Sequence, residues 1–229
     1  CIKKLFNYLG KYIGQDKKFV GPINGTTWQN FRISLDEEQP PFFLEPFNPD
    51  YYEALLKQYG FETVQTNIST LQRTQDLDFT AYEKKFSILK TQGFSFDIFS
   101  SENAMELLPQ LYEAVYEAFQ ETLLFIKISL EEFLYIFSDY LKNTDESYVF
   151  VIKNDKGRVV GFCFAMLDLF CRDKKRLIVK TMGVGPEFQG QGIGSAGFWY
   201  IHHLAEERGV EEIIFSTMRE GNDKIHNIC

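Results

Sequence analysis

Apolar and polar positions along the chain form two patterned regions separated by a polar stretch, Gln72–Lys85. Helical spacing of apolar residues predicts helices over 1–13, 51–59, 107–119 and the residues that follow Ser129. Apolar runs, alternation and β-branched residues predict strands or extended segments over 42–47, 61–71, 94–99, 147–153, 158–170 and 176–184. This mixture of helices and strands predicts an α/β (α+β) fold.

Capping and turn residues sharpen several of these boundaries. Asn48 before Pro49 is typical of a helix start, and Gly60 of a helix end. Ser129 and Glu132 have the spacing of a capping box. We place Pro109 in the first turn of its helix, and the turn 154–157 predicts a β-hairpin.

Composition and charge narrow the class of protein. The chain has 229 residues, of which 45% are hydrophobic and 24% charged, as in globular proteins. Lys plus Arg is 24 and Asp plus Glu is 32, which gives a net charge of −8. Such a chain repels phosphate backbones on average, so we expect no nucleic-acid partner. The aromatic content of 16% indicates a core filled by large side chains.

Cysteine and hydropathy patterns bear on metals and compartment. Cys1, Cys163, Cys171 and Cys229 are widely spaced and lack a nearby metal-binding histidine pattern, so we expect neither a metal site nor a disulfide framework. No apolar run is long enough for a membrane span and no signal peptide is evident, so we expect a cytoplasmic protein without a membrane partner. The chain starts within a predicted helix and stops where another is expected, so we also expect a piece of a longer protein.

A glycine-rich turn joins the predicted strand over 176–184 to an amphipathic helix that ends at Gly209. Because glycine lacks a Cβ atom, such a backbone can approach a bulky anion closely. The free N–H groups and the dipole of the first helical turn then favour a diphosphate. The turn lacks the Gly-Lys-Ser/Thr of a P-loop and follows a strand meander, not a β-α-β unit. A purely structural connection is the alternative.

The turn Gln189-Gly190-Gln191-Gly192-Ile193-Gly194 resembles the Q/R-x-x-G-x-G/A signature of the GNAT superfamily of acyl-CoA-dependent N-acyltransferases. The predicted order from about Phe94 to Arg219, with a further strand at 211–217, is similar to that fold. The resemblance implies a mixed, mostly antiparallel sheet flanked by helices, with acetyl-CoA (coenzyme A) as cosubstrate and no metal.

The first 71 residues look similar to the end of such a fold, with Leu56 standing where the family has a tyrosine before Gly60 and Phe61. Two arrangements compete: tandem repeats, of which the first is incomplete, or an N-terminal segment that completes the C-terminal sheet. We favour tandem repeats. The expected division is a partial GNAT-like segment over 1–75, a linker over 76–90, and an acyl-CoA-binding domain over 91–229 whose C-terminal end is incomplete.

The resemblance assigns site residues at the turn and on the preceding strand. It implies phosphate contact by Gln189, Gly190, Gln191, Gly192, Ile193, Gly194 and Ser195, and contact with the pantetheine arm by the backbone of Met182 and Val184. A backbone N–H near Met182 or Gly183 would stabilise the oxyanion. Asn222 is a further expected cofactor contact, and the tyrosine expected beyond it falls at Cys229.

Candidates for the general base are Asp168 and Glu220, each at the end of a predicted strand, and a solvated loop carboxylate is the alternative for both. We expect an N-acetyltransferase that moves an acetyl group to a primary amine of a small molecule or peptide by direct attack in a ternary complex. A non-catalytic acyl-CoA-binding or interaction module and an enzyme that transfers longer acyl or aminoacyl groups remain open. The sequence does not identify the acceptor or the oligomeric state.

Overall fold

The computed structural model describes residues 2–13, 18–23, 26, 28, 31–35, 40–142 and 148–220, with the main chain only at 2 and 138–142. The chain divides into two compact units, Cys1–Val64 and Gln65–Cys229. Each unit is described by itself.

The first unit contains helices α1 (Ile2–Ile13) and α2 (Tyr51–Gln58), which match the predicted helices. Gly60 ends the second helix with φ +81°, and its N–H donates to Lys57 O at 3.0 Å. Asn48 does not cap α2, because its side chain instead accepts from Ser34 N at 2.7 Å and donates to Ser34 O at 3.1 Å. Asp50 occupies the N-cap position.

The predicted strand over 42–47 is absent, since these described residues form turns and loop. Leu44 has φ +70°, which interrupts extended backbone, and Phe47 is 83% exposed. Pro46 cannot donate a ladder hydrogen bond. The apolar residues of this segment are therefore not part of a buried strand.

The second unit is built on a six-stranded sheet. Its strands are β1 (Asn67–Arg73), β2 (Ser95–Ile98), β3 (Phe150–Lys153), β4 (Val159–Leu167), β5 (Arg176–Val184) and β6 (Glu212–Arg219). They lie in the order β1-β6-β5-β4-β3-β2, and every neighbouring pair is antiparallel except β5 and β6. The predicted mixed, mostly antiparallel sheet is confirmed.

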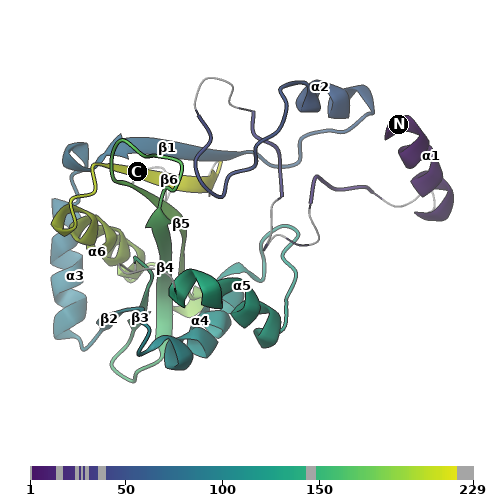
Figure 1. The fold of residues 1–229 in the computed structure, drawn as a ribbon. Coiled ribbons are helices and arrows are strands. Elements are labelled where there is room, and N and C mark those ends of the chain that lie inside the picture. The colour runs from purple at the N-terminus through teal and green to yellow at the C-terminus, as the bar shows by residue number, and fades with distance from the viewer. Residues whose placement is uncertain are drawn as a thin grey trace. The chain divides into compact units, whose positions relative to one another are not determined.

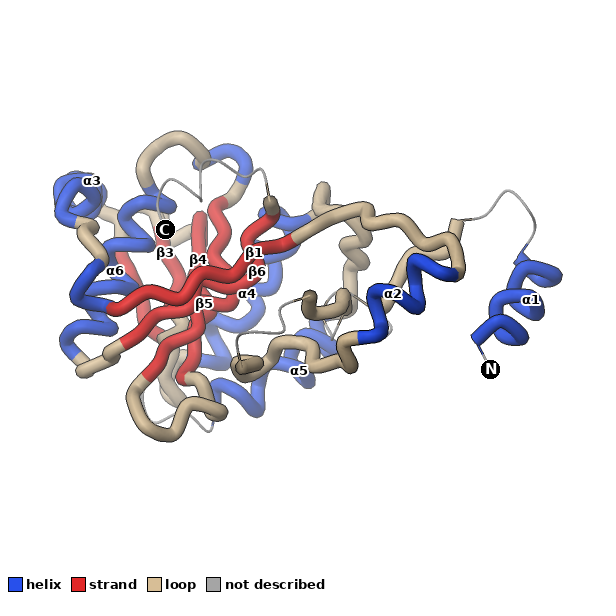
Figure 2. Tube along the Cα trace, turned by 90° about the horizontal axis from the view of Figure 1, so that it is seen from above, coloured by secondary structure: helices blue, strands red, loops and turns tan. Residues whose placement is uncertain are grey.

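Helices cover both faces of this sheet (Figures 1 and 2). They are α3 (Thr80–Thr91), α4 (Ala104–Phe119), α5 (Leu130–Lys142) and α6 (Ile193–Glu207), with short 3-10 turns at Thr74–Asp76 and Pro186–Phe188. Helices α3 and α6 pack on one face, and Phe119 of α4 and Phe137 of α5 contact Phe162 and Phe164 on the other. Among the described helices, none combines the length and apolarity of a membrane span.

The segment 76–90, expected to be a linker, lies inside the second unit and is largely helix α3. Phe79 and Leu89 are each 3% exposed and belong to the core, against which Tyr82 and Phe86 also pack. The polar composition masked these apolar residues, which recur at helical spacing. The compact unit accordingly begins at Gln65, ahead of the expected boundary at 75.

Strand β1 lies on the N-terminal side of that expected boundary and pairs with β6 along Asn67–Arg73. Residues 67–73 thus complete the edge of the sheet, as the second of the two arrangements describes for part of the N-terminal segment. The predicted extended segment over 61–71 is a strand only from Asn67 onward.

Two local sequence signals in the second unit, a capping box and a helical proline, can be compared with the structure. The capping box forms, with Ser129 N donating to Glu132 Oε2 at 2.8 Å and Glu132 N donating to Ser129 Oγ at 3.2 Å. Hydrogen bonds from the backbone N–H and hydroxyl of Ser129 lower the pKa of the Glu132 carboxyl. Pro109 differs from its prediction, because it lies beyond the first turn of a helix that begins at Ala104.

Candidate functional site

The glycine-rich turn follows β5 directly and leads into α6. Gly185 N donates to Val160 O at 2.9 Å, which fixes the start of the turn against β4. Gly190 and Gly192 have φ +80° and +86°, values that residues with a Cβ adopt only with strain. Gly192 is the N-cap of α6, and its carbonyl accepts from Ala196 N at 2.9 Å. These glycines therefore let the chain reverse sharply into the helix.

The electrostatics of the turn favour an anion. The first N–H groups of a helix have no intrahelical acceptor, and the helix dipole is positive at this end. No acidic residue lies in the first turn of α6. Glu187, which precedes it, is paired with Arg158 at 3.2 Å, as suits a surface carboxylate. The geometry can accept a phosphate at Gly192–Ser195.

Strands β5 and β6 separate beside this turn. Their pairing runs from Arg176 with Glu212 to Val179 with Phe215 and stops there. On the other edge of β5, Met182, Gly183 and Val184 remain paired with β4. The register between β4 and β5 shifts between Val179 and Thr181, a bulge that bends the strand. Among the described residues, no strand pairs with the β6-facing edge of β5 beyond Val179.

Ser216 lies immediately after the last β6 residue that pairs with β5. It is 7% exposed, and its Oγ has no hydrogen-bond partner among the described residues. An unsatisfied buried hydroxyl costs free energy unless another polar group meets it. Ser216 is therefore a buried hydroxyl next to the point where the pairing of β5 with β6 ends.

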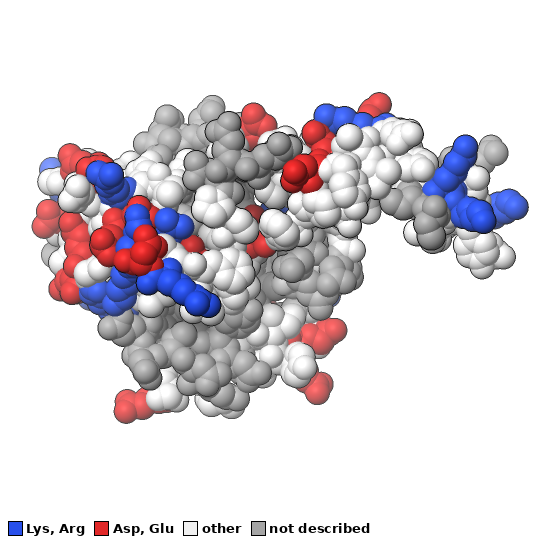
Figure 3. All heavy atoms as spheres, turned by 45° about the horizontal axis from the view of Figure 1, so that its top comes forward, with Lys and Arg blue, Asp and Glu red and all other residues white. Residues whose placement is uncertain are grey.

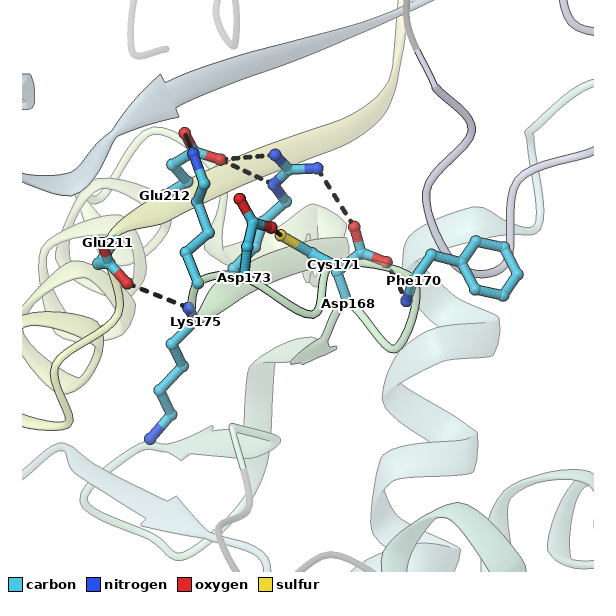
Figure 4. Close-up of polar contacts among 9 residues, drawn as sticks. Asp168, Phe170, Cys171, Asp173, Lys175, Glu211 and Glu212 are labelled. Carbon is cyan, nitrogen blue, oxygen red and sulfur yellow. Dashed lines mark hydrogen bonds and ion pairs between the residues drawn. The ribbon is translucent and has the colours of Figure 1, made fainter.

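The candidate base Asp168 lies at the opposite end of β5 from the turn. Its N–H donates to Arg176 O at 2.8 Å, next to the β4–β5 loop. The carboxylate is buried, accepts from Phe170 N at 3.1 Å and pairs with Arg176 at 3.5 Å (Figure 4). Lys180 at the bulge lies four positions beyond Arg176, about 13 Å along β5. Asp168 is therefore held in a structural ion network away from the opening.

The same network includes Glu212, whose carboxylate forms salt bridges with Arg176 at 2.7 Å and with Lys174 at 2.8 Å (Figure 4). Basic and acidic side chains intermingle on the surface seen in Figure 3. Partial burial and a hydrogen bond with Asp173 raise the pKa of the Cys171 thiol. Lys174 and Arg176 are thus paired with the carboxylates of Glu212 and Asp168.

Replacing Glu212 with glutamine is expected to lower the free energy of unfolding by about 1–3 kcal/mol at pH 7. Burial favours a higher pKa for this carboxyl, but hydrogen bonds from Lys174 and Arg176 outweigh it, so the folded-state pKa is lowered. Its contribution is therefore present above the ordinary glutamate pKa of about 4.3 and is lost as pH falls through the folded value.

Urea unfolding of wild type and Glu212→Gln at pH 7 and at about pH 4 measures this effect. The difference between the two proteins should shrink at the lower pH. Glu211→Gln is the matched control and should change little, since Glu211 is exposed and, among the described residues, its carboxylate accepts a single long bond of 3.3 Å, from Lys175 N. An equal difference at both pH values would show that the charge of Glu212 does not matter.

The other candidate base, Glu220, directly follows β6 and is exposed, and its N–H donates to Thr66 O at 3.1 Å. Asn222, the expected cofactor contact, lies outside the described residues, as do Cys1 and Cys229. The structure thus brings Met182–Val184 and Gln189–Ser195 together around one strand end, while Asp168 lies at the other.

Adjacent histidines on α6 have separate roles. His202 is buried and its Nε2 lies 3.0 Å from Thr74 O, whereas the ring of His203 stacks on Trp199 with centroids 4.9 Å apart. Among the described residues, no cluster of three or more His, Cys, Asp or Glu side chains has an arrangement suited to a metal ion.

Two residues of interest were missed by the sequence reasoning. Ser216 carries no motif, and its hydroxyl stands out only once its burial is known. Lys85 lay in the expected linker, but its Nζ is 3.5 Å from Ser195 Oγ at the turn. The helical spacing of Phe79, Phe86 and Leu89 was the available signal for the helix that carries it.

Comparison with known proteins gives a consistent family and fold. Residues 108–228, more than half of the chain, match the profile described as "Acetyltransferase (GNAT) family". No curated protein matches the sequence.

Two solved structures have similar folds. A GCN5-related N-acetyltransferase from Sphaerobacter thermophilus has a TM-score of 0.54 at 18% identity, over 76% of this chain and 50% of that one. The GCN5-related glucosamine N-acetyltransferase region of a fungal multi-domain GH3 beta-N-acetylglucosaminidase has a TM-score of 0.55 at 14% identity, over 77% of this chain and 21% of that one. The chain thus spans half or less of these proteins, and the likeness at these identities shows the fold.

Proposed function

Because the chain belongs to the GNAT acetyltransferase family, we propose that it is an N-acetyltransferase that uses acetyl-CoA and acts on a primary amine. The observation that carries the proposal is the glycine turn placed beside the open edge of β5. The turn provides N–H groups for the diphosphate at Gln189–Ser195, and the backbone of Met182 and Val184 is available to the pantetheine arm.

The reaction is a direct transfer in a ternary complex. The neutral amine attacks the thioester carbonyl, a C–N bond forms, and the C–S bond breaks to release the CoA thiolate. In this proposal a backbone N–H near Met182 or Gly183 stabilises the oxyanion that develops on the carbonyl oxygen. The ammonium form of the amine first loses a proton to a base, and the proton that the nitrogen gives up after the attack balances the one that the thiolate gains.

For the base we favour Glu220 over Asp168. Glu220 is exposed at the end of β6, the strand that forms one side of the opening. Asp168 is buried and forms an ion pair with Arg176 at 3.5 Å, which leaves it little access to an amine. The acceptor is a small-molecule or peptide amine.

Amine-dependent release of CoA thiol from acetyl-CoA tests the activity. The full chain should release thiol in the presence of at least one member of a panel of primary amines, and Glu220→Gln should lower kcat with little change in acetyl-CoA affinity. Acyl donors of increasing length compare acetyl with longer acyl or aminoacyl transfer. Tight binding of acetyl-CoA without turnover for any amine would favour the non-catalytic binding module.

A further inference from the structure

Helix α3 lies along α6, the helix that begins at the glycine turn (Figure 1). Phe86 anchors it, with its ring 4.4 Å from that of Trp199 and 5.7 Å from that of Tyr200. Leu89, also on α3, is buried in the core. Such aromatic packing fixes the position of α3 against α6, so the residue beside Phe86 is held at a defined place.

That residue is Lys85, whose side chain crosses the turn. Its Cδ would lie 3.4 Å from a Cβ at Gly192, and its Nζ lies 3.5 Å from Ser195 Oγ. These two residues flank the start of α6 and are both expected phosphate contacts. The ammonium group therefore lies at the mouth of the proposed diphosphate site although it comes from a position 110 residues earlier in the chain than Ser195.

Within the described part of the chain, no acidic side chain pairs with Lys85. Its Nζ contacts the Ser195 hydroxyl and the ring of Tyr82, whose centroid is 5.3 Å away. The nearby Glu187 is occupied by Arg158. An unneutralised cation therefore adds to the positive end of the helix dipole, in a chain whose net charge is −8.

We propose that Lys85 is a phosphate-binding residue that pairs with the diphosphate of acyl-CoA at the turn. This inference rests on the proposed function. A lysine ammonium is a compact point charge on a flexible stem, so it can move from Ser195 Oγ to a phosphate oxygen without a change in the fold. Helix α3 thereby supplies a side-chain cation to a site otherwise made of backbone N–H groups.

Calorimetric titration of wild type and Lys85→Gln with acetyl-CoA, 3′-dephospho-CoA and pantetheine tests this role. Lys85→Gln is expected to weaken the binding of acetyl-CoA and of 3′-dephospho-CoA by the same factor, about tenfold. Lys85→Arg should retain most of the affinity. Lys84→Gln, the exposed neighbour on α3, is the matched control and should bind as wild type does.

The outcomes separate this role from the proposed function. An affinity of Lys85→Gln within twofold of wild type would overturn the role of Lys85 while the proposed function stands. A loss seen with acetyl-CoA but not with 3′-dephospho-CoA would assign Lys85 to the 3′-phosphate and overturn the diphosphate contact. Failure of the folded wild-type chain to bind any CoA compound would overturn the proposed function and this inference together.

Discussion

Replacing Gly194 with valine is expected to weaken acetyl-CoA binding by about 100-fold while the fold remains intact. Gly194 lies in the first turn of α6, where Cα–Cβ bonds lean toward the helix N-terminus and so toward the proposed phosphate. A Cβ there would lie 3.8 Å from Val184 Cγ2, an ordinary van der Waals contact, and the backbone is not left-handed. The position therefore tolerates a Cβ, and we expect the added methyl groups to compete with the ligand.

Gly194 is a cleaner test than Gly192, because Gly192 has φ +86° and a side chain there strains the backbone whatever binds. Calorimetric titration measures affinity, and thermal unfolding checks that Gly194→Val is folded. Gly10→Val, at an exposed helical glycine with open space around its Cβ position, is the matched control and should bind as wild type does. Unchanged affinity in folded Gly194→Val would remove the phosphate from this turn.

Replacing Gly183 with alanine is expected to lower the free energy of unfolding by about 2–3 kcal/mol. A Cβ at this position would lie 2.7 and 2.8 Å from two ring carbons of Phe162 and 3.2 Å from Ala118 Cβ. Phe162 is only 2% exposed and lies against Phe119, so its ring has little room to move. Relief requires a shift of β5 or of α4, each of which disturbs the core.

Chemical denaturation measures the loss for Gly183→Ala. Gly183→Ala should lower the free energy of unfolding less in a Phe162→Leu background than in wild type, because the smaller side chain leaves space for the new methyl group. Gly194→Ala is the matched control and should be neutral or slightly stabilising, since its Cβ meets no close atom and alanine favours helix. A stable Gly183→Ala variant without coupling to Phe162 would contradict this packing.

Sequence reasoning predicted the elements whose signals are local. The strand over 176–184 has the predicted limits, and the bonds between Ser129 and Glu132 follow from a capping box that needs only four consecutive residues. The glycine turn was located for the same reason, since positive φ at Gly190 and Gly192 is a local backbone requirement.

Features that depend on distant residues were not accessible in this way. The partner of β1 is β6, more than a hundred residues later, and no local pattern specifies that pairing. Helix α3 was read as linker because its apolar residues are sparse and become a core face only against α6. Lys85 and Ser216 acquire interest from burial and proximity, which the chain order does not encode.

Charge pairing also limits how well the sequence predicts the catalytic base. The position of Asp168 at a strand end was predicted from sequence, but its pairing with Arg176 and its burial come from the packing of the β4–β5 loop. A buried carboxylate that is paired with a cation in this way has a structural role. The choice of Glu220 as base therefore rests on access to the opening, not on sequence.

The most direct test of the central claim is calorimetric titration of the folded wild-type chain with acetyl-CoA, 3′-dephospho-CoA and pantetheine. The account predicts binding of acetyl-CoA that persists with 3′-dephospho-CoA and is lost with pantetheine, because the turn recognises the diphosphate. Equal affinity for acetyl-CoA and pantetheine, or no binding of either, would contradict a diphosphate site at Gln189–Ser195.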